Sequence, residues 1–159
     1  MARSGRLLSL NVARASAVTI GDRSVMTAIG KRAVDGARAV GPLGIEGDEQ
    51  ADLSVHGGPS KAVYAYPSEH YPFWQTVRAQ AGVAPWDEPL VPGALGENLT
   101  LAGVVESEVF IGDVLRFPNC AQEWKRSDAA SLQSASACSM NSIANTKLSL
   151  QSVSKARRT

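Results

Sequence analysis

Short apolar stretches separated by glycine- and proline-rich turns run through most of this chain, and they constrain its fold more than any other feature. The stretches at residues 6–12, 62–67 and 109–117 are rich in leucine, valine, tyrosine or phenylalanine and are short for helices. Short stretches of this kind with turn residues between them are typical of strands in sandwiches and barrels. The sequence therefore predicts a mainly β (α+β) fold, a barrel-like sheet with a few helices.

One segment departs from this pattern and predicts a helix at residues 69–81. Ser68 precedes it as a candidate cap, and Pro72 lies in the first turns, where a missing N–H costs least. Apolar and aromatic side chains recur at helical spacing, and His70 lies on the same face as Phe73 and Trp74. We expect His70 to pack or to cap rather than to bind a ligand.

The composition is that of an ordinary globular domain. The chain has 159 residues, 44% of them hydrophobic and 19% charged, so we expect one domain with a real core. A formal net charge of +1 gives no indication of a nucleic-acid polymer or an anionic membrane as partner. No apolar run approaches the roughly 20 residues that cross a bilayer. Cys120 and Cys138 make no disulfide framework, which indicates a reducing, cytoplasmic location.

A long polar segment at residues 41–61, GPLGIEGDEQADLSVHGGPSK, interrupts the β-like stretches. A loop of this length in a compact domain is usually functional or disordered, and its small apolar residues favour an ordered, functional loop. Gly57 and Gly58 let the backbone adopt positive φ angles, and successive N–H groups in such a turn form a nest for anions. Lys61 adds a positive charge. The segment indicates an anion-binding loop, with a tight turn and a solvated lysine as the alternative.

Other polar side chains of this loop leave more than one role open. Asp48, Glu49 and Asp52 form an acidic cluster. A solvated acidic turn is favoured over a hard-cation site, because the pattern of a calcium loop is absent. His56 is a candidate ligand, proton donor or structural histidine.

A second glycine-punctuated loop, GALGENL at residues 93–99, leads directly into a predicted strand. Glu97 and Asn98 stand at the strand end, where binding groups often lie. The alternative is a turn in which the asparagine adopts a left-handed conformation.

Four motifs, in this order along the chain, are similar to those of one protein family. They are GIEGDEQADLSVHGGPSKAV, YPSEHYPFW, GALGENLT and VFIGDVLRF, and the likeness covers about residues 5–118. They resemble the MOSC family, the molybdenum-cofactor sulfurase C-terminal domain, and in particular its bacterial YiiM-like subgroup. The resemblance implies a β-barrel-like fold that binds molybdenum cofactor (molybdopterin with molybdenum). It also implies reduction of small N-hydroxylated substrates, such as hydroxylamino purines and amidoximes, with electrons from a redox partner protein.

The same resemblance assigns roles to residues of both loops. It implies two catalytic candidates in the first loop, Asp48 and His56. The cofactor-binding candidates come from both loops: Gly57, Gly58, Lys61, Glu97 and Asn98. The cofactor carries a pterin phosphate, which suits glycine N–H groups and a lysine.

The chain departs from the family pattern beyond about residue 118. The family continues with a strand and a Q-P-R-x-P-C-type motif, whose cysteine supplies a thiolate to molybdenum. Here residues 133–138, QSASAC, keep only the Gln-to-Cys spacing and lie several residues too far from Gly112. Cys120 comes too early. Cys138 is therefore the candidate metal ligand and a further catalytic candidate.

Residues 119–159 are rich in serine and alanine, and their one aromatic residue is Trp124. Weak helical patterns occur around residues 129–150. We expect residues 1–118 to hold the N-terminal and central part of a MOSC domain. We expect residues 119–159 to be an atypical tail that a frame shift or truncation produced, which would leave the barrel incomplete at the C-terminus. The alternatives to an enzyme are a cofactor or sulfur carrier without turnover and an inactive truncated product.

Overall fold

Strands dominate the structure, a computed structural model that describes residues 3–53, 57–58, 62–109, 113–118, 120–127, 129–133, 138–141 and 146–151. In chain order the elements are β1 (Arg3–Val12), β2 (Ser16–Ile20), β3 (Arg23–Thr27), β4 (Arg32–Ala33), β5 (Ala37–Gly41), β6 (Gly44–Ile45), β7 (Val63–Pro67), the 3₁₀ turn η2 (Ser68–His70), α1 (Tyr71–Gln80), β8 (Leu99–Ala102), the 3₁₀ turn η3 (Glu106–Glu108), β9 (Val114–Phe117), β10 (Cys120–Ser127), β11 (Ala129–Gln133), β12 (Cys138–Asn141) and β13 (Thr146–Gln151). The predicted mainly β class, with strands far outnumbering helices, is confirmed.

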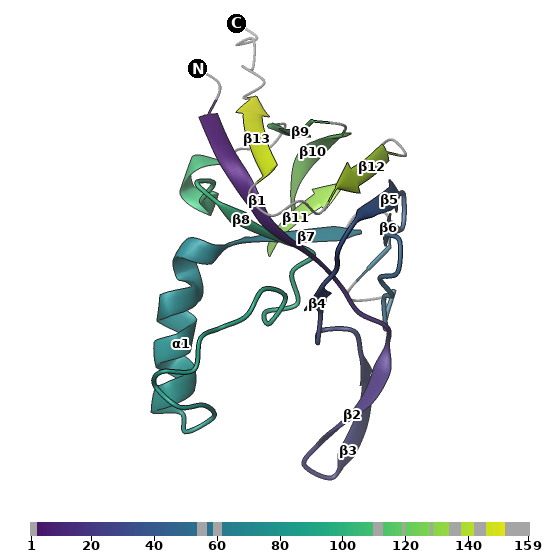
Figure 1. Cartoon of the computed structure of the whole chain (residues 1–159). Helices are drawn as coiled ribbons and strands as arrows, with labels where there is room; N and C mark the ends of the chain where they lie inside the picture. Colours follow the sequence, from purple (N-terminus) through teal and green to yellow (C-terminus); the bar gives the residue numbers. More distant parts are fainter. Residues whose placement is uncertain are drawn as a thin grey trace, which may run out of the picture.

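Eight strands form one curled, barrel-like sheet, in the order β13-β9-β10-β11-β7-β8-β1-β4 (Figure 1). β13 pairs antiparallel with both β9 and β1, so the two sides of the sheet meet. β12, β5 and β6 make a smaller sheet, and β2 pairs with β3 in a hairpin of its own. The first strand and the last described strand thus lie side by side.

The helical patterns expected around residues 129–150 are wrong, because the described part of this segment forms β11, β12 and β13. Partners from the first half of the chain hold two of these strands: β11 pairs with β7, and β12 pairs with β5. Backbone pairing of this kind overrides a weak local preference. The boundary expected between residues 118 and 119 falls in the β9–β10 connection and stays a prediction.

A bulge in β1 lets two leucines three residues apart face the same core. Leu7 and Leu10 are both fully buried, although side chains at that spacing lie on opposite faces of a regular strand. The register with β8 shifts between Leu7 and Ser9, and one extra residue in a strand restores the face. The core that these leucines enter also takes side chains from β5, β7, β8 and β9.

The connection from β7 to β8 carries the helix and the second glycine-punctuated loop. β7 and β8 are parallel, with Ala65 opposite Leu99 and Tyr66 opposite Thr100, so the chain must cross over between them. The crossover runs through η2, α1 and residues 81–98 before it returns beside β7. It thereby places the residues just before β8 next to Tyr64, where the site described below is built.

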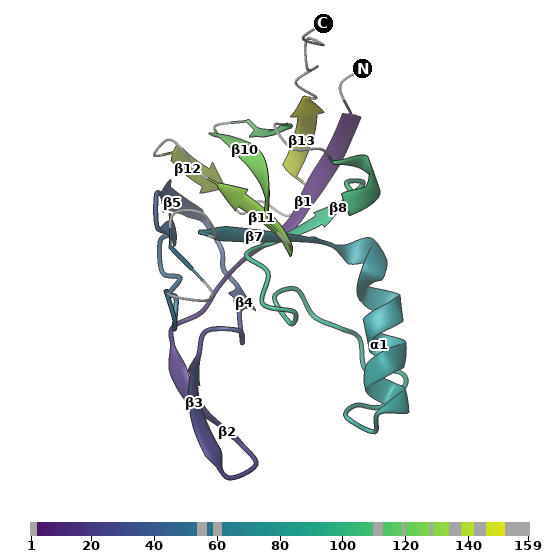
Figure 2. The ribbon, with the colours of Figure 1, turned by 180° about the vertical axis from the view of Figure 1, so that it is seen from behind.

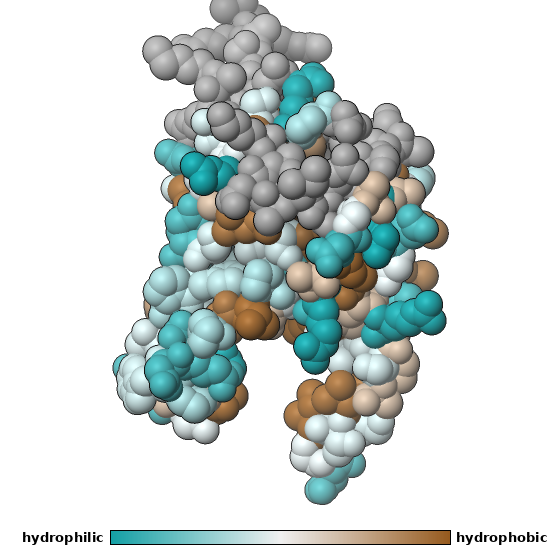
Figure 3. Space-filling view, in the orientation of Figure 1, coloured by the Kyte–Doolittle hydropathy of each residue, from teal (hydrophilic) through white to brown (hydrophobic). Residues whose placement is uncertain are grey.

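Two elements project from the sheet on the same side, the β2–β3 hairpin and α1 (Figures 1 and 2). A hollow separates them in the space-filling view (Figure 3). No residue of α1 is buried, and Phe73 is 62% exposed. His70 rather than Ser68 holds the N-cap position of α1, without a side-chain capping bond, and its Nε2 lies 2.8 Å from Glu106 Oε2. His70 therefore has a structural contact, as the sequence analysis favoured.

Candidate functional site

Asp48 is buried and fully engaged by donors from three distant segments. The turn after β6 directs it inward, where Gly47 has a φ of 88° and Asp48 N donates to Ile45 O. Its Oδ1 forms an ion pair with Lys31 and accepts from Ala13 N at 2.8 Å. The Asp48 side chain is 5% exposed and that of Lys31 is 9% exposed, so each charge needs the other. The solvated acidic turn favoured from the sequence is therefore wrong for Asp48.

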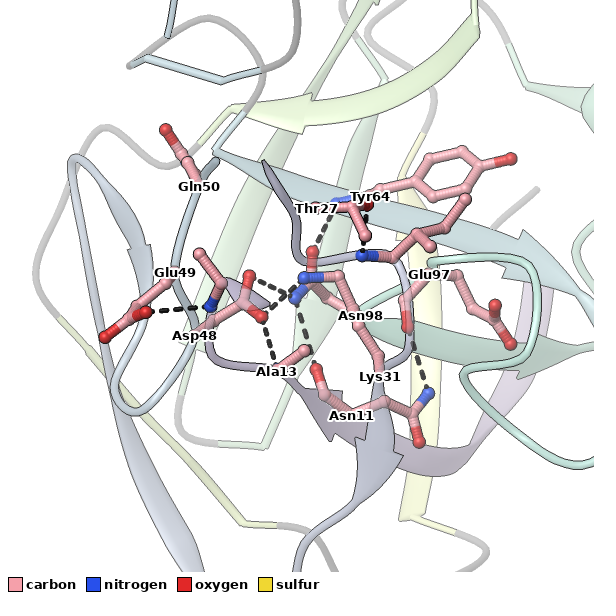
Figure 4. Close-up of polar contacts among 12 residues, drawn as sticks. Asn11, Ala13, Thr27, Lys31, Asp48, Glu49, Gln50, Tyr64, Glu97 and Asn98 are labelled. Carbon is pink, nitrogen blue, oxygen red and sulfur yellow. Dashed lines mark hydrogen bonds and ion pairs between the residues drawn. The ribbon is translucent and has the colours of Figure 1, made fainter. Parts of the chain in front are cut away.

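Asn98 connects the first loop to the second, as Figure 4 shows. Its Nδ2 donates to Asp48 Oδ2 at 2.8 Å and to Asn11 O at 3.1 Å. Its Oδ1 accepts from Tyr64 N at 3.0 Å, and its own N–H donates to Tyr64 O at 2.7 Å. Asn98 thus uses its amide to link β1, β7 and the loop of Asp48. Two residues that the sequence singled out separately, Asp48 and Asn98, are in direct contact.

Glu97 is completely buried and serves as an acceptor for its own loop. Its Oε1 accepts from Gly93 N at 2.7 Å and from Thr100 Oγ1 at 3.0 Å, and its Oε2 accepts from Leu95 N at 3.1 Å. The hydroxyl of Tyr71, at the start of α1, donates a further bond to Oε1. No positive side chain contacts this carboxylate in the described part of the chain, so four neutral donors stabilise it.

Asn11 and Thr100 complete a polar network that the sequence analysis missed. Asn11 Nδ2 donates to Thr100 Oγ1 at 3.0 Å and to Glu97 O at 3.2 Å. Asn11 Oδ1 accepts from Ser9 Oγ at 2.7 Å. Both residues lie inside predicted strands. The sequence feature that could have identified them is that each places a polar side chain in an apolar run. The network joins the surroundings of Glu97 to those of Asp48.

Two tyrosines beside the network have raised pKa values. Burial, followed by the nearby Tyr66, Glu97 and Glu106, raises the pKa of Tyr64 to about 12. Burial also raises the pKa of Tyr71, and its hydrogen bond to Glu97 adds to the rise. Both hydroxyls therefore keep their protons at neutral pH, and that of Tyr71 remains a donor.

The glycine turn of the first loop is held by a side chain of the same loop. Gly57 and Gly58 have φ angles of 149° and 73°, as the expected turn requires. Gly58 N donates to Gln50 Oε1 at 2.6 Å, and Gln50 Nε2 donates to Leu43 O at 3.0 Å. A β-carbon on Gly58 would meet no described atom within 4 Å, so the backbone is open there.

The remaining predicted site residues are placed only in part. His56 and Lys61 lie outside the described residues. Cys138 begins β12, where its backbone is opposite Val40 of β5, one residue before the start of the first loop. No group of three or more histidine, cysteine, aspartate or glutamate side chains in the described ranges is arranged to hold a metal ion.

These loops belong to a known domain family. The MOSC domain profile matches residues 52–159, so the chain is a member of the MOSC domain family, which is associated with molybdenum cofactor binding. The uncharacterized protein YflK of Bacillus subtilis (strain 168) is 44% identical over 110 residues, which cover 69% of this chain and 46% of YflK. The protein YiiM of Escherichia coli (strain K12) is 45% identical over 94 residues, covering 57% of this chain and 38% of YiiM. The predicted YiiM-like subgroup is thereby confirmed.

Two further similarities bear on function and on fold. A protein named reductase from Gibberella moniliformis (strain M3125 / FGSC 7600) is 33% identical over 114 residues, covering 72% of this chain and 19% of that protein. The crystal structure of YiiM from Geobacillus stearothermophilus matches 93% of this chain and 75% of its own, with a TM-score of 0.64 and 23% identity. That match confirms the MOSC-type fold. The matched regions span less than half the length of the curated relatives.

None of the helices in the described ranges has the length and apolar character needed to span a bilayer.

Proposed function

We propose that this chain binds molybdenum cofactor and reduces small N-hydroxylated compounds such as hydroxylamino purines and amidoximes. The observation that carries the proposal is the 2.8 Å hydrogen bond from Asn98 Nδ2 to Asp48 Oδ2. It joins the two loops to which the family resemblance assigns the cofactor site. The relative named reductase supports a redox activity, and membership of the MOSC family supports the cofactor.

The described residues fit an anionic cofactor in charge and in space. The carboxylate of Asp48 is neutralised by Lys31, so it does not oppose a phosphate as a bare carboxylate would. That of Glu97 is held toward the N–H groups of its own loop. The backbone at Gly58 has a positive φ, and a β-carbon there would meet no described atom within 4 Å, which lets a ligand approach the main chain. Its N–H donates to Gln50 Oε1, so a bound phosphate would have to take the place of that side-chain oxygen. In this proposal Gly57, Gly58 and Lys61 hold the pterin phosphate.

The other candidates take roles around that group. Glu97 and Asn98 fix the second loop, and Asp48 holds Asn98 and Lys31 in place. His56 is the proposed proton donor to the leaving oxygen. Cys138 is the proposed thiolate ligand of molybdenum, a role that suits a soft ligand. Its pairing opposite Val40 puts its backbone at the strand from which the first loop begins.

The proposed reaction uses two electrons and two protons to convert an N–OH group into N–H and water: R–NHOH gives R–NH₂, and an amidoxime R–C(NH₂)=NOH gives the amidine R–C(NH₂)=NH. The bound cofactor supplies the two-electron chemistry that breaks the N–O bond. A redox partner protein supplies the electrons, and the chain supplies orientation and one proton.

Reduction of 6-hydroxylaminopurine to adenine and of benzamidoxime to benzamidine, with reduced methyl viologen as electron donor, tests this proposal. We expect chain purified from cells supplied with molybdate to form these products, and Cys138→Ala to lose at least about 100-fold of that activity, since loss of a residue that only orients a metal ligand already costs about 10–100-fold. Cys120→Ala is the matched control and should retain activity. Bound cofactor without formation of either product would favour a carrier, and equal activity of the two cysteine variants would remove Cys138 from the ligand role.

A further inference from the structure

The loop at residues 93–97 is held from two sides. On one side the carboxylate of Glu97 accepts from Gly93 N and Leu95 N. On the other side the loop lies directly against the segment after β3. A β-carbon on Gly93 would come within 2.5 Å of Lys31 O, and one on Gly96 within 2.9 Å of Ile29 Cγ1. The loop therefore has no room to move toward Lys31.

Tyr71 is the donor to Glu97 that comes from outside this loop and its strand. The other three donors, Gly93, Leu95 and Thr100, lie within four residues of Glu97 along the chain. Tyr71 reaches the same Oε1 from the first turn of α1, and its hydroxyl also lies 3.3 Å from Thr100 Oγ1. A carboxylate that is bonded only within its own loop can rotate together with that loop. A donor on a helix outside the loop fixes the direction of the carboxylate.

The other contacts at the start of α1 do not reach the site. Glu69 accepts from Gly103 N at 2.6 Å, and His70 pairs with Glu106 on an exposed surface. Trp74 Nε1 donates to the hydroxyl of Tyr66 at 2.6 Å. These contacts hold the helix to the sheet, but they end on groups outside the network of Glu97 and Asn98.

We propose that Tyr71 is a positioning residue for the proposed cofactor site, because its hydroxyl fixes Glu97 and thereby the loop that ends at Asn98. This inference rests on the function proposed above. The chain of contacts is continuous: Tyr71 donates to Glu97, Asn11 donates to the carbonyl of Glu97, and Asn98 donates to Asn11 O and to Asp48. Loss of the tyrosine hydroxyl leaves the aromatic ring of Tyr71 in place and removes the external donor to Glu97 together with its contact to Thr100 Oγ1.

The test compares Tyr71→Phe with Tyr66→Phe in the full chain. Tyr66 is the matched control, because its ring stacks on Tyr71 with centroids 6.4 Å apart while its hydroxyl has no contact with Glu97 in the described structure. Amide hydrogen exchange read by mass spectrometry reports the loop directly. Molybdenum retained during dialysis, measured by elemental analysis, reports the site.

We expect Tyr71→Phe to speed exchange of the Gly93 and Leu95 amides by about tenfold, the usual effect of losing one hydrogen bond to a charged group. Exchange in β1 and β8 should stay unchanged, and bound molybdenum should be lost about tenfold faster than from the wild type. Tyr66→Phe, which loses the bond from Trp74 Nε1, should raise exchange in α1 but leave exchange at Gly93 and Leu95 and molybdenum retention at their wild-type values.

Three results would overturn the inference. Unchanged exchange at residues 93–98 would show that the hydroxyl does not order the loop. Equal acceleration in every strand would show a general loss of stability instead. Faster exchange in the loop with unchanged molybdenum retention would show that order in the loop does not affect the cofactor site. A wild-type chain without molybdenum would contradict the proposed function and the cofactor part of this inference, while the exchange pattern would still decide whether Tyr71 orders the loop.

Discussion

Two buried carboxylates, 49 positions apart in the chain, hold the two predicted site loops by different means. Asp48 is neutralised by a cation, Lys31, and its remaining donors come from Ala13 and Asn98. Glu97 has only neutral donors, three of them within its own segment and the fourth from Tyr71. The first arrangement joins distant parts of the chain, and the second shapes one loop. Loss of Asp48 should therefore be felt throughout the fold, and loss of Glu97 mainly in its loop.

The largest expected effect is that of Asp48→Ala. Removal of the carboxylate leaves the ammonium of Lys31 buried without its counter-charge, and we expect the free energy of unfolding to fall by about 3–5 kcal/mol. Urea unfolding followed by circular dichroism measures the change. A second substitution, Lys31→Met, removes the stranded charge and should restore more than half of the loss. A loss below about 1 kcal/mol in the single variant would contradict a buried, mutually dependent pair.

Gly93→Ala should come next, at about 3 kcal/mol. The residue has a φ of 87°, and the added methyl group would meet Lys31 O at 2.5 Å, so backbone strain and overlap add together. Gly82→Ala is the matched control, because Gly82 has a φ of 68° but no described atom within 4 Å of a β-carbon. The control should lose only about 1 kcal/mol in the same urea experiment. Equal losses would mean that the loop can retreat from Lys31.

Glu97→Gln should cost about 2 kcal/mol, less than Asp48→Ala, because an amide of the same shape keeps one acceptor and strands no charge. We expect the loss to appear as faster hydrogen exchange at residues 93–98 before it appears elsewhere. Glu88→Gln is the surface control: Glu88 pairs with Arg78 at 2.8 Å on an exposed face and should change stability by less than about 0.5 kcal/mol. A uniform rise in exchange across all strands of Glu97→Gln would contradict the view that Glu97 acts mainly on its own loop while Asp48 acts on the whole fold.

The smallest effect near neutral pH is that of Tyr64, because its contribution to stability changes only at alkaline pH. The pKa of Tyr64 is raised from 10.0 to about 12 in the folded chain, so its contribution to stability is complete below pH 10 and is lost as the pH rises toward 12. Tyr64→Phe should flatten this part of the stability profile. Absorbance titration of tyrosinate at 295 nm, with urea unfolding at each pH, measures both quantities. A tyrosine titration complete near pH 10 would show that the site is more open to water than its contacts indicate.

The fold could be predicted where side-chain pattern and local structure agree. The apolar stretch at residues 6–12 lies in β1, the stretch at 62–67 gives β7, and the helix expected at 69–81 gives α1. The strands β10 to β13 could not be predicted, because their serine- and alanine-rich segments carry little pattern and are held by distant neighbours such as β5 and β7. The fold of this part is decided by pairing, which no local window contains.

The site could be predicted as a set of loops but not as a network. Asp48 and Asn98 were singled out in separate motifs, and only the parallel crossover from β7 to β8 brings them together. Tyr71 and Asn11 were missed because each lies in a helix or strand that is predicted from its apolar neighbours. Their importance depends on the buried carboxylate and amide opposite them, which sequence spacing does not reveal.

The most direct test of the account is the molybdenum content of the purified full chain. The chain should be expressed in two matched strains, one able to make molybdenum cofactor and one lacking its synthesis, and measured by elemental mass spectrometry. The account predicts molybdenum approaching one atom per chain from the first strain and none from the second, with Cys138→Ala from the first strain depleted relative to the wild type. Absence of molybdenum from the wild-type chain in both strains would contradict it.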